Sequence, residues 1–181
     1  MKKIIYLLTV VSVLLSCDNN DNLLTSNSEA KVNQILKLNN VNEQKLAYSI
    51  LLPDEKVVIW KNHLKLMISL NNYNKKQLLF IDNLHNSLSP ELISNKSKTN
   101  DTFNIKVKTD GLKLFSKQDL FNLIASLTLT SKAQPPPISG CGCSSSSDWC
   151  ISGDCNGTAY CLRSGDGCGS WFDYGCNGDC M

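Results

Sequence analysis

The sequence predicts a mostly α-helical fold with a small disulfide-rich module: a short helical bundle, a proline linker, and then a turn-rich C-terminal domain with four disulfides. Three observations predict this. Apolar residues recur at helical spacing over much of 28–130, three consecutive prolines end at Pro137, and eight of the nine cysteines lie between Cys141 and Cys180. A chain of 181 residues has room for one ordinary domain of ~100–150 residues plus such a module.

The segment 1–16 has the pattern of a signal peptide. Lys2 and Lys3 precede an apolar run, Ile4–Leu15. As a helix this run would be ~18 Å long, short of the ~30 Å core of a bilayer, so we interpret it as a signal-peptide core. Leu-Leu-Ser-Cys at its end resembles the lipobox of bacterial lipoproteins, which implies that Cys17 carries the lipid. The alternative is an ordinary cleaved signal peptide with an incidental cysteine.

The lipid would place the protein at the cell envelope, with the outer membrane or the cell surface favoured. Two or three acyl chains on Cys17 would make release negligible, because each buried CH₂ contributes about 0.8 kcal/mol. The polar segment 17–27 is predicted to be a solvated tether. Its two acids, Asp18 and Asp21, resemble a signal for surface display in some Gram-negative lineages.

The segment 28–130 is predicted to be a mostly helical domain. Val32, Ile35 and Leu36 form one short apolar face, and a second helix should begin at Pro53, since proline and the acids after it suit a first helical turn. A further helix is expected over about 75–88, and Ser89-Pro90-Glu91 has the pattern of a new cap and first turn. Two apolar stripes support these helices: Val57, Trp60, Leu64, Met67 and Ile68, and then Ile81, Leu84 and Leu88.

The next segment has a different pattern. Asn95–Asp101 is polar and is expected to be a loop, and Phe103, Ile105 and Val107 alternate with polar residues as in a strand. With a turn at Asp-Gly, this alternation predicts a β-hairpin near 102–115. A last helix should be capped by Ser116 with Asp119 three residues on. Its apolar stripe is Leu120, Leu123, Ile124 and Leu127.

No catalytic constellation is recognisable, so we predict that the protein is not an enzyme and binds no cofactor. His63 and His85 are the two histidines, and ordinary partly buried side chains are favoured over a paired metal or acid–base role. From Cys17 to Pro137, fifteen lysines face eleven acids, about +4; from Ile138 onward, five aspartates face one arginine, about −4. No basic stripe is interleaved with aromatics, which argues against a nucleic-acid partner.

A linker, 131–140, is expected to separate the helices from the module at 141–181. Its prolines favour an extended strut that holds the module off the helical domain and is reachable by proteases. So short a module cannot fold on apolar burial alone, and four disulfides would compensate. Zinc and a calcium site at Asp154, Asn156 and Asp166 are the disfavoured alternatives, because Cys-x-x-Cys pairs are lacking and those residues suit turns. The cysteines are Cys141, Cys143, Cys150, Cys155, Cys161, Cys168, Cys176 and Cys180, and 105 pairings are open.

The module contains Cys-x-Cys-Ser-x-x-Ser-Asp-x-Cys at 141–150, Gly-Thr-Ala-x-Cys at 157–161, Gly-Cys-Gly at 167–169 and Cys-Asn-Gly at 176–178. This pattern resembles the bacteriocin fulvocin C and its lipoprotein relatives. The resemblance implies an antibacterial role, anchored by the N-terminal lipid and directed at the envelope of another cell. Because the module is acidic, a protein or glycan target is favoured over anionic lipid.

Four aromatic side chains of the module are the candidate target contacts: Trp149, Trp171, Phe172 and Tyr174. Exposed aromatics on a rigid scaffold are typical binding hot spots. The alternative is that they form the small core of the module. The function hypothesis is thus a bacteriocin-like lipoprotein, and its rival is a non-lethal adhesion or binding lipoprotein that uses the same module. Whether the module is released by proteolysis is left open.

Overall fold

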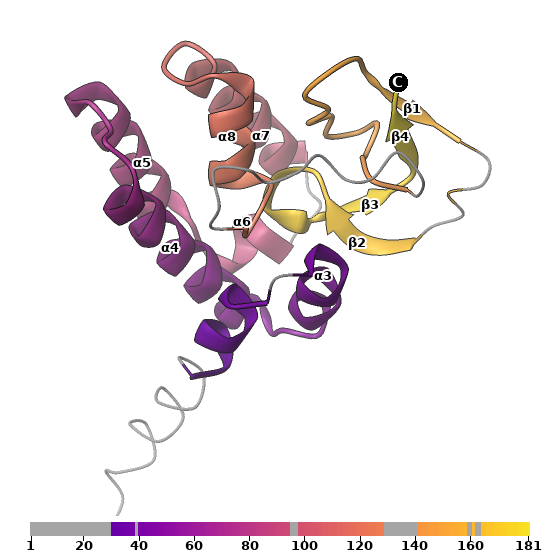
Figure 1. Cartoon of the computed structure of the whole chain (residues 1–181), viewed down its shortest axis with the longest axis horizontal. Helices are drawn as coiled ribbons and strands as arrows, with labels where there is room; N and C mark the ends of the chain where they lie inside the picture. The colour runs from indigo at the N-terminus through magenta and orange to yellow at the C-terminus, as the bar shows by residue number, and fades with distance from the viewer. Residues whose placement is uncertain (1–29, 39, 95–97, 129–140, 159–160, 162–163) are drawn as a thin grey trace, which may run out of the picture.

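The computed structural model describes residues 30–38, 40–94, 98–128, 141–158, 161 and 164–181. The predicted signal peptide, the predicted lipid-attachment residue Cys17, the predicted tether and the predicted linker at 131–140 lie outside the described residues. The structure is mostly helical, with a C-terminal cluster of four disulfides and short strands, as Figure 1 shows.

Helices make up the described chain before the module. Residues 30–36 are helical and bury Val32, Ile35 and Leu36, as predicted. Both predicted apolar stripes face the interior, since Trp60, Leu64 and Ile81 are fully buried. The remaining helices are α3 (Val41–Ser49), α4 (Pro53–Leu70), α5 (Lys75–Ser87), α6 (Pro90–Ser94), α7 (Lys98–Gly111) and α8 (Lys117–Ile124).

Side-chain caps explain where several of these helices begin. Asn40 accepts hydrogen bonds from the N–H groups of Asn42 and Glu43 at the start of α3. Asn74 and Gln77 form a reciprocal capping box at the start of α5. The predicted cap of α8 is confirmed, because Ser116 Oγ accepts from the Asp119 N–H at 3.1 Å. Such bonds satisfy N–H groups that have no partner inside the helix.

The predicted β-hairpin at 102–115 is wrong, because 102–111 belong to α7 and 112–115 form turns after it. The expected loop at 95–101 is wrong for 98–101, where α7 begins. The buried positions are Asn104, Val107 and Gly111, which share one helical face, whereas Ile105 is 66% exposed. Two of these three buried positions carry no apolar side chain, so the apolar residues of this segment do not repeat with the helical period. The alternation of Phe103, Ile105 and Val107 with polar residues arises by chance. A Cβ on Gly111 would lie 2.6 Å from a Leu120 methyl carbon, so this glycine permits close packing with α8 rather than a hairpin turn.

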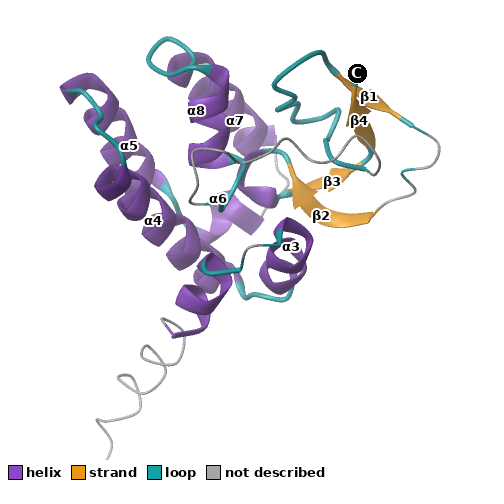
Figure 2. Cartoon of the chain, in the orientation of Figure 1, coloured by secondary structure: helices purple, strands orange, loops and turns teal. Residues whose placement is uncertain are grey.

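The module consists of two short antiparallel sheets, drawn as strands in Figure 2. One pairs β1 (Cys155–Gly157) with β4 (Gly178–Cys180), and the other pairs β2 (Ser164–Cys168) with β3 (Tyr174–Cys176). A short 3₁₀ helix, η2 (Ser170–Phe172), connects β2 to β3. Asp148 organises the first turn, since its two carboxylate oxygens accept from the N–H groups of Cys150 and Cys155 at 2.8 and 3.1 Å.

The module packs directly on the helices, beside α3 and α7 in Figure 1. Strand β2 contacts α3, and the Trp60 indole of α4 donates a hydrogen bond to the Trp171 carbonyl at 3.2 Å. The expectation that the module is held off the helical domain is therefore wrong, because its aromatic residues complete the helical core. Among the described residues, no helix is long and apolar enough to cross a membrane.

Candidate functional site

Four disulfides join the eight cysteines of the module, which confirms the prediction that they pair among themselves. The bonds are Cys141–Cys161, Cys143–Cys155, Cys150–Cys180 and Cys168–Cys176. Three of them tie the first ten residues of the module to later segments. The fourth closes the β2–β3 hairpin, so that the loop between these strands is fixed at its base by a covalent bond.

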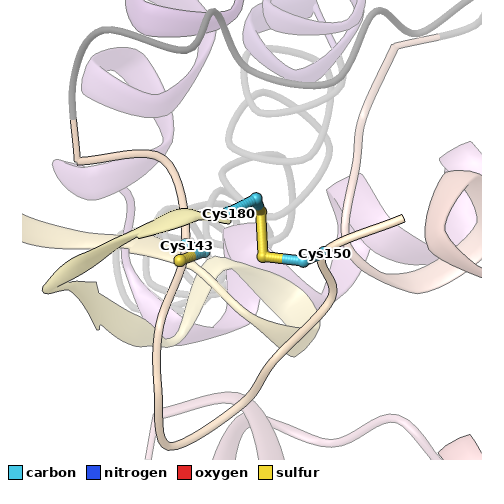
Figure 3. Close-up of side chains that lie close together, drawn as sticks. All are labelled: Cys143, Cys150 and Cys180. Atoms are coloured by element: carbon cyan, nitrogen blue, oxygen red, sulfur yellow. A yellow bond between two sulfur atoms is a disulfide. The ribbon is translucent and has the colours of Figure 1, made fainter. Parts of the chain in front are cut away.

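Three of the sulfur atoms lie close together, as Figure 3 shows. The Sγ atoms of Cys143, Cys150 and Cys180 are within 4.8 Å of one another. Each is bonded in a disulfide, Cys143 to Cys155 and Cys150 to Cys180. Zinc is bound by thiolates, which disulfide sulfurs are not. In this oxidised form the cluster is therefore a pair of neighbouring cross-links rather than a set of metal ligands.

The β2–β3 hairpin carries two large aromatic residues, Trp171 and Phe172, which we call the aromatic tip. Both have left-handed backbone angles, with φ of 60° and 57°. This conformation costs a non-glycine residue about 1–3 kcal/mol and persists only where the surroundings enforce it. The Cys168–Cys176 disulfide fixes one side of the tip. On the other, the Trp149 indole donates to Ser170 Oγ at 3.0 Å.

Replacing Gly169, which precedes the tip, with alanine is expected to destabilise the module by about 1–3 kcal/mol. Gly169 has a φ of +71°, and a Cβ there would lie 2.6 Å from Tyr174 Cδ2 and 2.7 Å from Ser147 Cβ. The matched control is Gly157→Ala, whose Cβ would meet nothing nearer than an oxygen at 3.6 Å. Guanidinium unfolding of the oxidised chain should separate the two variants. Equal midpoints for both would contradict this account of the hairpin.

The helices form a socket around the aromatic tip, made by Tyr48 of α3, Trp60 of α4 and Asn104 of α7. Trp171 is fully buried and Phe172 is 2% exposed. The Trp171 ring packs edge-on against Trp60, with the ring centres 5.2 Å apart. The Phe172 ring packs edge-on against Trp60 at 5.5 Å and against Tyr48 at 5.6 Å. Edge-to-face pairs at these separations add to the stabilisation from apolar burial.

Polar bonds fix the orientation of the tip in the socket. The Trp171 indole N–H donates to Asn104 Oδ1 at 2.9 Å, and the Asn104 amide donates to the Tyr174 hydroxyl at 2.9 Å. That hydroxyl donates in turn to Asp101 Oδ1 at 2.9 Å. Burial, together with this bond to Asp101, raises the pKa of Tyr174 to about 12. Tyr174 is therefore a neutral donor at physiological pH.

Two lysines of the helices also contact the acidic module. The Lys45 ammonium of α3 lies 5.6 Å from the centre of the Phe172 ring, and the Lys108 ammonium of α7 lies 4.8 Å from a ring centre of Trp149. Lys108 also donates a hydrogen bond to the carbonyl oxygen of Asp148. Burial lowers the pKa of both lysines, because removal from water disfavours the charged ammonium.

The expected exposure of the candidate contact residues is wrong for three of the four. Trp149, Trp171 and Phe172 are buried, and Tyr174 is half-buried. The alternative, that they form the core of the module itself, does not describe Trp171 and Phe172, because their ring partners Tyr48 and Trp60 belong to the helices. The physical reason is that the module lies on the helices, so that side chains on one of its edges are covered.

No family model, curated protein or solved structure matches this chain. The relation to fulvocin C stays a prediction carried by the residues of the module.

The two histidines have different surroundings on neighbouring helices. His63 of α4 is fully buried, and its Nε2 lies 2.7 Å from the carbonyl oxygen of Asn122, whereas its Nδ1 has no partner among the described residues. Burial lowers the pKa of His63 to about 4. His85 of α5 is half-buried, with Nδ1 3.4 Å from Asn86 Oδ1. The socket has no signal in the sequence, because Tyr48 and Asn104 belong to no motif.

Proposed function

We propose that this chain is a bacteriocin-like antibacterial lipoprotein whose disulfide-rich module acts on the envelope of competing bacteria. The observation that carries the proposal is the rigid hairpin, whose loop is closed by Cys168–Cys176 and carries two large aromatics that would face a target once the module leaves the helices. A stapled loop with aromatic residues loses little conformational entropy on binding, which favours tight recognition of a target. The fulvocin-like cysteine pattern of the module supports the same assignment.

The charge of the module indicates the class of target. Five aspartates and one arginine give it about −4, and one of these acids, Asp154, is exposed. An anionic surface is repelled by the negative phospholipids of bacterial membranes. A protein or glycan of the envelope is therefore the target class that we propose. The N-terminal lipid at Cys17 would hold the chain on the producing cell.

The antibacterial proposal is tested by releasing the module from the purified, oxidised full chain. A protease recognition sequence is placed within 131–140, the chain is cut, and the module is assayed on plates against related strains. We expect growth inhibition by the oxidised module and none after its disulfides are reduced and alkylated, because the staples hold its shape. Absence of inhibition against every related strain would contradict the antibacterial role.

A second candidate is a non-lethal adhesion or binding lipoprotein. The burial of the aromatic tip favours it, because a permanently docked module would act through its outer surface instead. Deleting 138–181 would then abolish attachment to partner cells or glycans and leave competition between strains unchanged. A competition defect with normal attachment would favour the bacteriocin-like role.

A further inference from the structure

The aromatic tip depends on the helices for its burial. Among the described residues, the ring partners of Trp171 and Phe172 are Tyr48 and Trp60, which both belong to helices. Without those helices, two large aromatic side chains would protrude from a module of about forty residues. Adjacent exposed aromatics of this size are typical of binding sites rather than of inert surfaces.

The socket, for its part, contains polar groups that are satisfied by the module. Asn104 is buried, and its amide accepts from the Trp171 indole and donates to Tyr174, both across the contact. The Trp60 indole likewise donates to the Trp171 carbonyl, as well as to the Tyr48 hydroxyl at 3.0 Å. A buried asparagine is costly on an ordinary helix face, since an unpaired amide loses its hydrogen bonds to water. Its presence here indicates a surface shaped to bind.

The two parts of the chain that meet at this contact carry opposite net charges. The chain from Cys17 to Pro137 carries about +4 and the chain from Ile138 onward about −4. Lys45 and Lys108 bring part of the positive charge to the contact, at the rings of Phe172 and Trp149. Opposite net charges speed association and fix the orientation of two partners. The contact therefore has an aromatic centre and satisfied hydrogen bonds and joins parts of opposite net charge, as interfaces between separate proteins do.

We propose that the helical part is a receptor for the aromatic tip, able to bind the module of its own chain or of a second copy and to keep the tip from any other partner. Its role as an inhibitor rests on the proposed antibacterial function; its role as a receptor does not. A helical part left on the producing cell after the module departs would present an empty socket. It would capture modules that reach that cell and so protect it.

The test uses the oxidised full chain with a protease site within 131–140. After cutting, the two pieces should co-elute in size-exclusion chromatography at micromolar concentration, and dilution gives their Kd. Asn104→Leu should weaken this Kd about 10- to 100-fold, because the Trp171 indole and the Tyr174 hydroxyl each lose a buried partner. The matched control is Ile105→Ala on the same helix, at a side chain that is 66% exposed, which should leave the Kd unchanged. Trp171→Phe, which keeps an aromatic ring, tests the same bond from the other side should Asn104→Leu fail to fold.

The inhibition assay separates the two proposals. The module diluted free of the helical part should inhibit growth, and an excess of helical part should suppress that inhibition, less so with Asn104→Leu. If the pieces separate at micromolar concentration, or if Asn104→Leu and the control have equal Kd values, the proposal that the helical part is a receptor is wrong. If bound and free module kill equally, the proposal that the helical part is an inhibitor is wrong. Tight, Asn104-dependent binding without killing by either form would support the receptor and reject the antibacterial function.

Discussion

Trp60→Ala is expected to lower the free energy of unfolding by about 3–5 kcal/mol, the usual cost of deleting a large buried aromatic. Trp60 is fully buried and contacts four rings, those of Tyr48, His63, Trp171 and Phe172. The substitution also removes the hydrogen bonds of its indole to Tyr48 and to the Trp171 carbonyl. The loss should therefore extend from α4 into the module.

Hydrogen exchange combined with denaturant unfolding would measure this effect. In Trp60→Ala, the amides of 171–176 should exchange faster than expected from the fall in global stability. The control is Ile81→Ala, which removes a fully buried side chain of α5. It should destabilise the protein by about 2–5 kcal/mol without a selective effect on the hairpin. If the hairpin amides of Trp60→Ala lose only as much protection as the global stability explains, as in the control, then Trp60 does not couple the helices to the module.

Acidification should destabilise the protein through His63. Burial lowers the pKa of His63 from 6.5 to about 4, so between these values the unfolded chain binds a proton that the folded chain does not. The stabilisation is complete above pH 6.5 and is lost as the pH falls towards 4. A shift of this size corresponds to about 3 kcal/mol.

The measurement is the free energy of unfolding as a function of pH between 4 and 8. His63→Phe should flatten the dependence over this window, although its stability at pH 8 should be lower, because the bond to the Asn122 carbonyl is lost. The control is His85→Gln, which leaves His63 as the one histidine and should retain the acid-side loss. NMR titration of the His63 ring in the unmodified chain gives the pKa directly. A measured value near 6.5 would remove the basis of the prediction.

The helices that could be predicted from sequence are those whose buried face is apolar. In α4, the stripe that includes Trp60, Leu64 and Met67 repeats with the helical period, and Pro53 stands at its first position. In α7 the same period passes through Asn104, Val107 and Gly111. Asparagine is at this face because it binds Trp171 and Tyr174, and glycine because Leu120 approaches closely. Residues chosen for long-range contacts thus stand where apolar residues would have marked the helix in the sequence.

Of the candidate site, only the presence of four disulfides could be predicted from the sequence. An even set of densely spaced cysteines indicates four disulfides, but eight cysteines allow 105 pairings, and nothing local selects among them. The socket could not be predicted, because Trp60 and Trp171 are 111 residues apart in the chain. Aromatic residues in a small module have the same sequence pattern whether they face solvent or a neighbouring domain. Composition cannot distinguish these environments.

The Cys168–Cys176 bond has a consequence for the order in which the molecule is completed. The helices need no oxidant to form, because their described segments contain no cysteine, whereas the left-handed loop that fits them is closed by this bond. Reducing conditions such as those of the cytosol prevent its closure. The helices can therefore form before oxidation, whereas the core they share with the aromatic tip is completed only after the Cys168–Cys176 bond has closed.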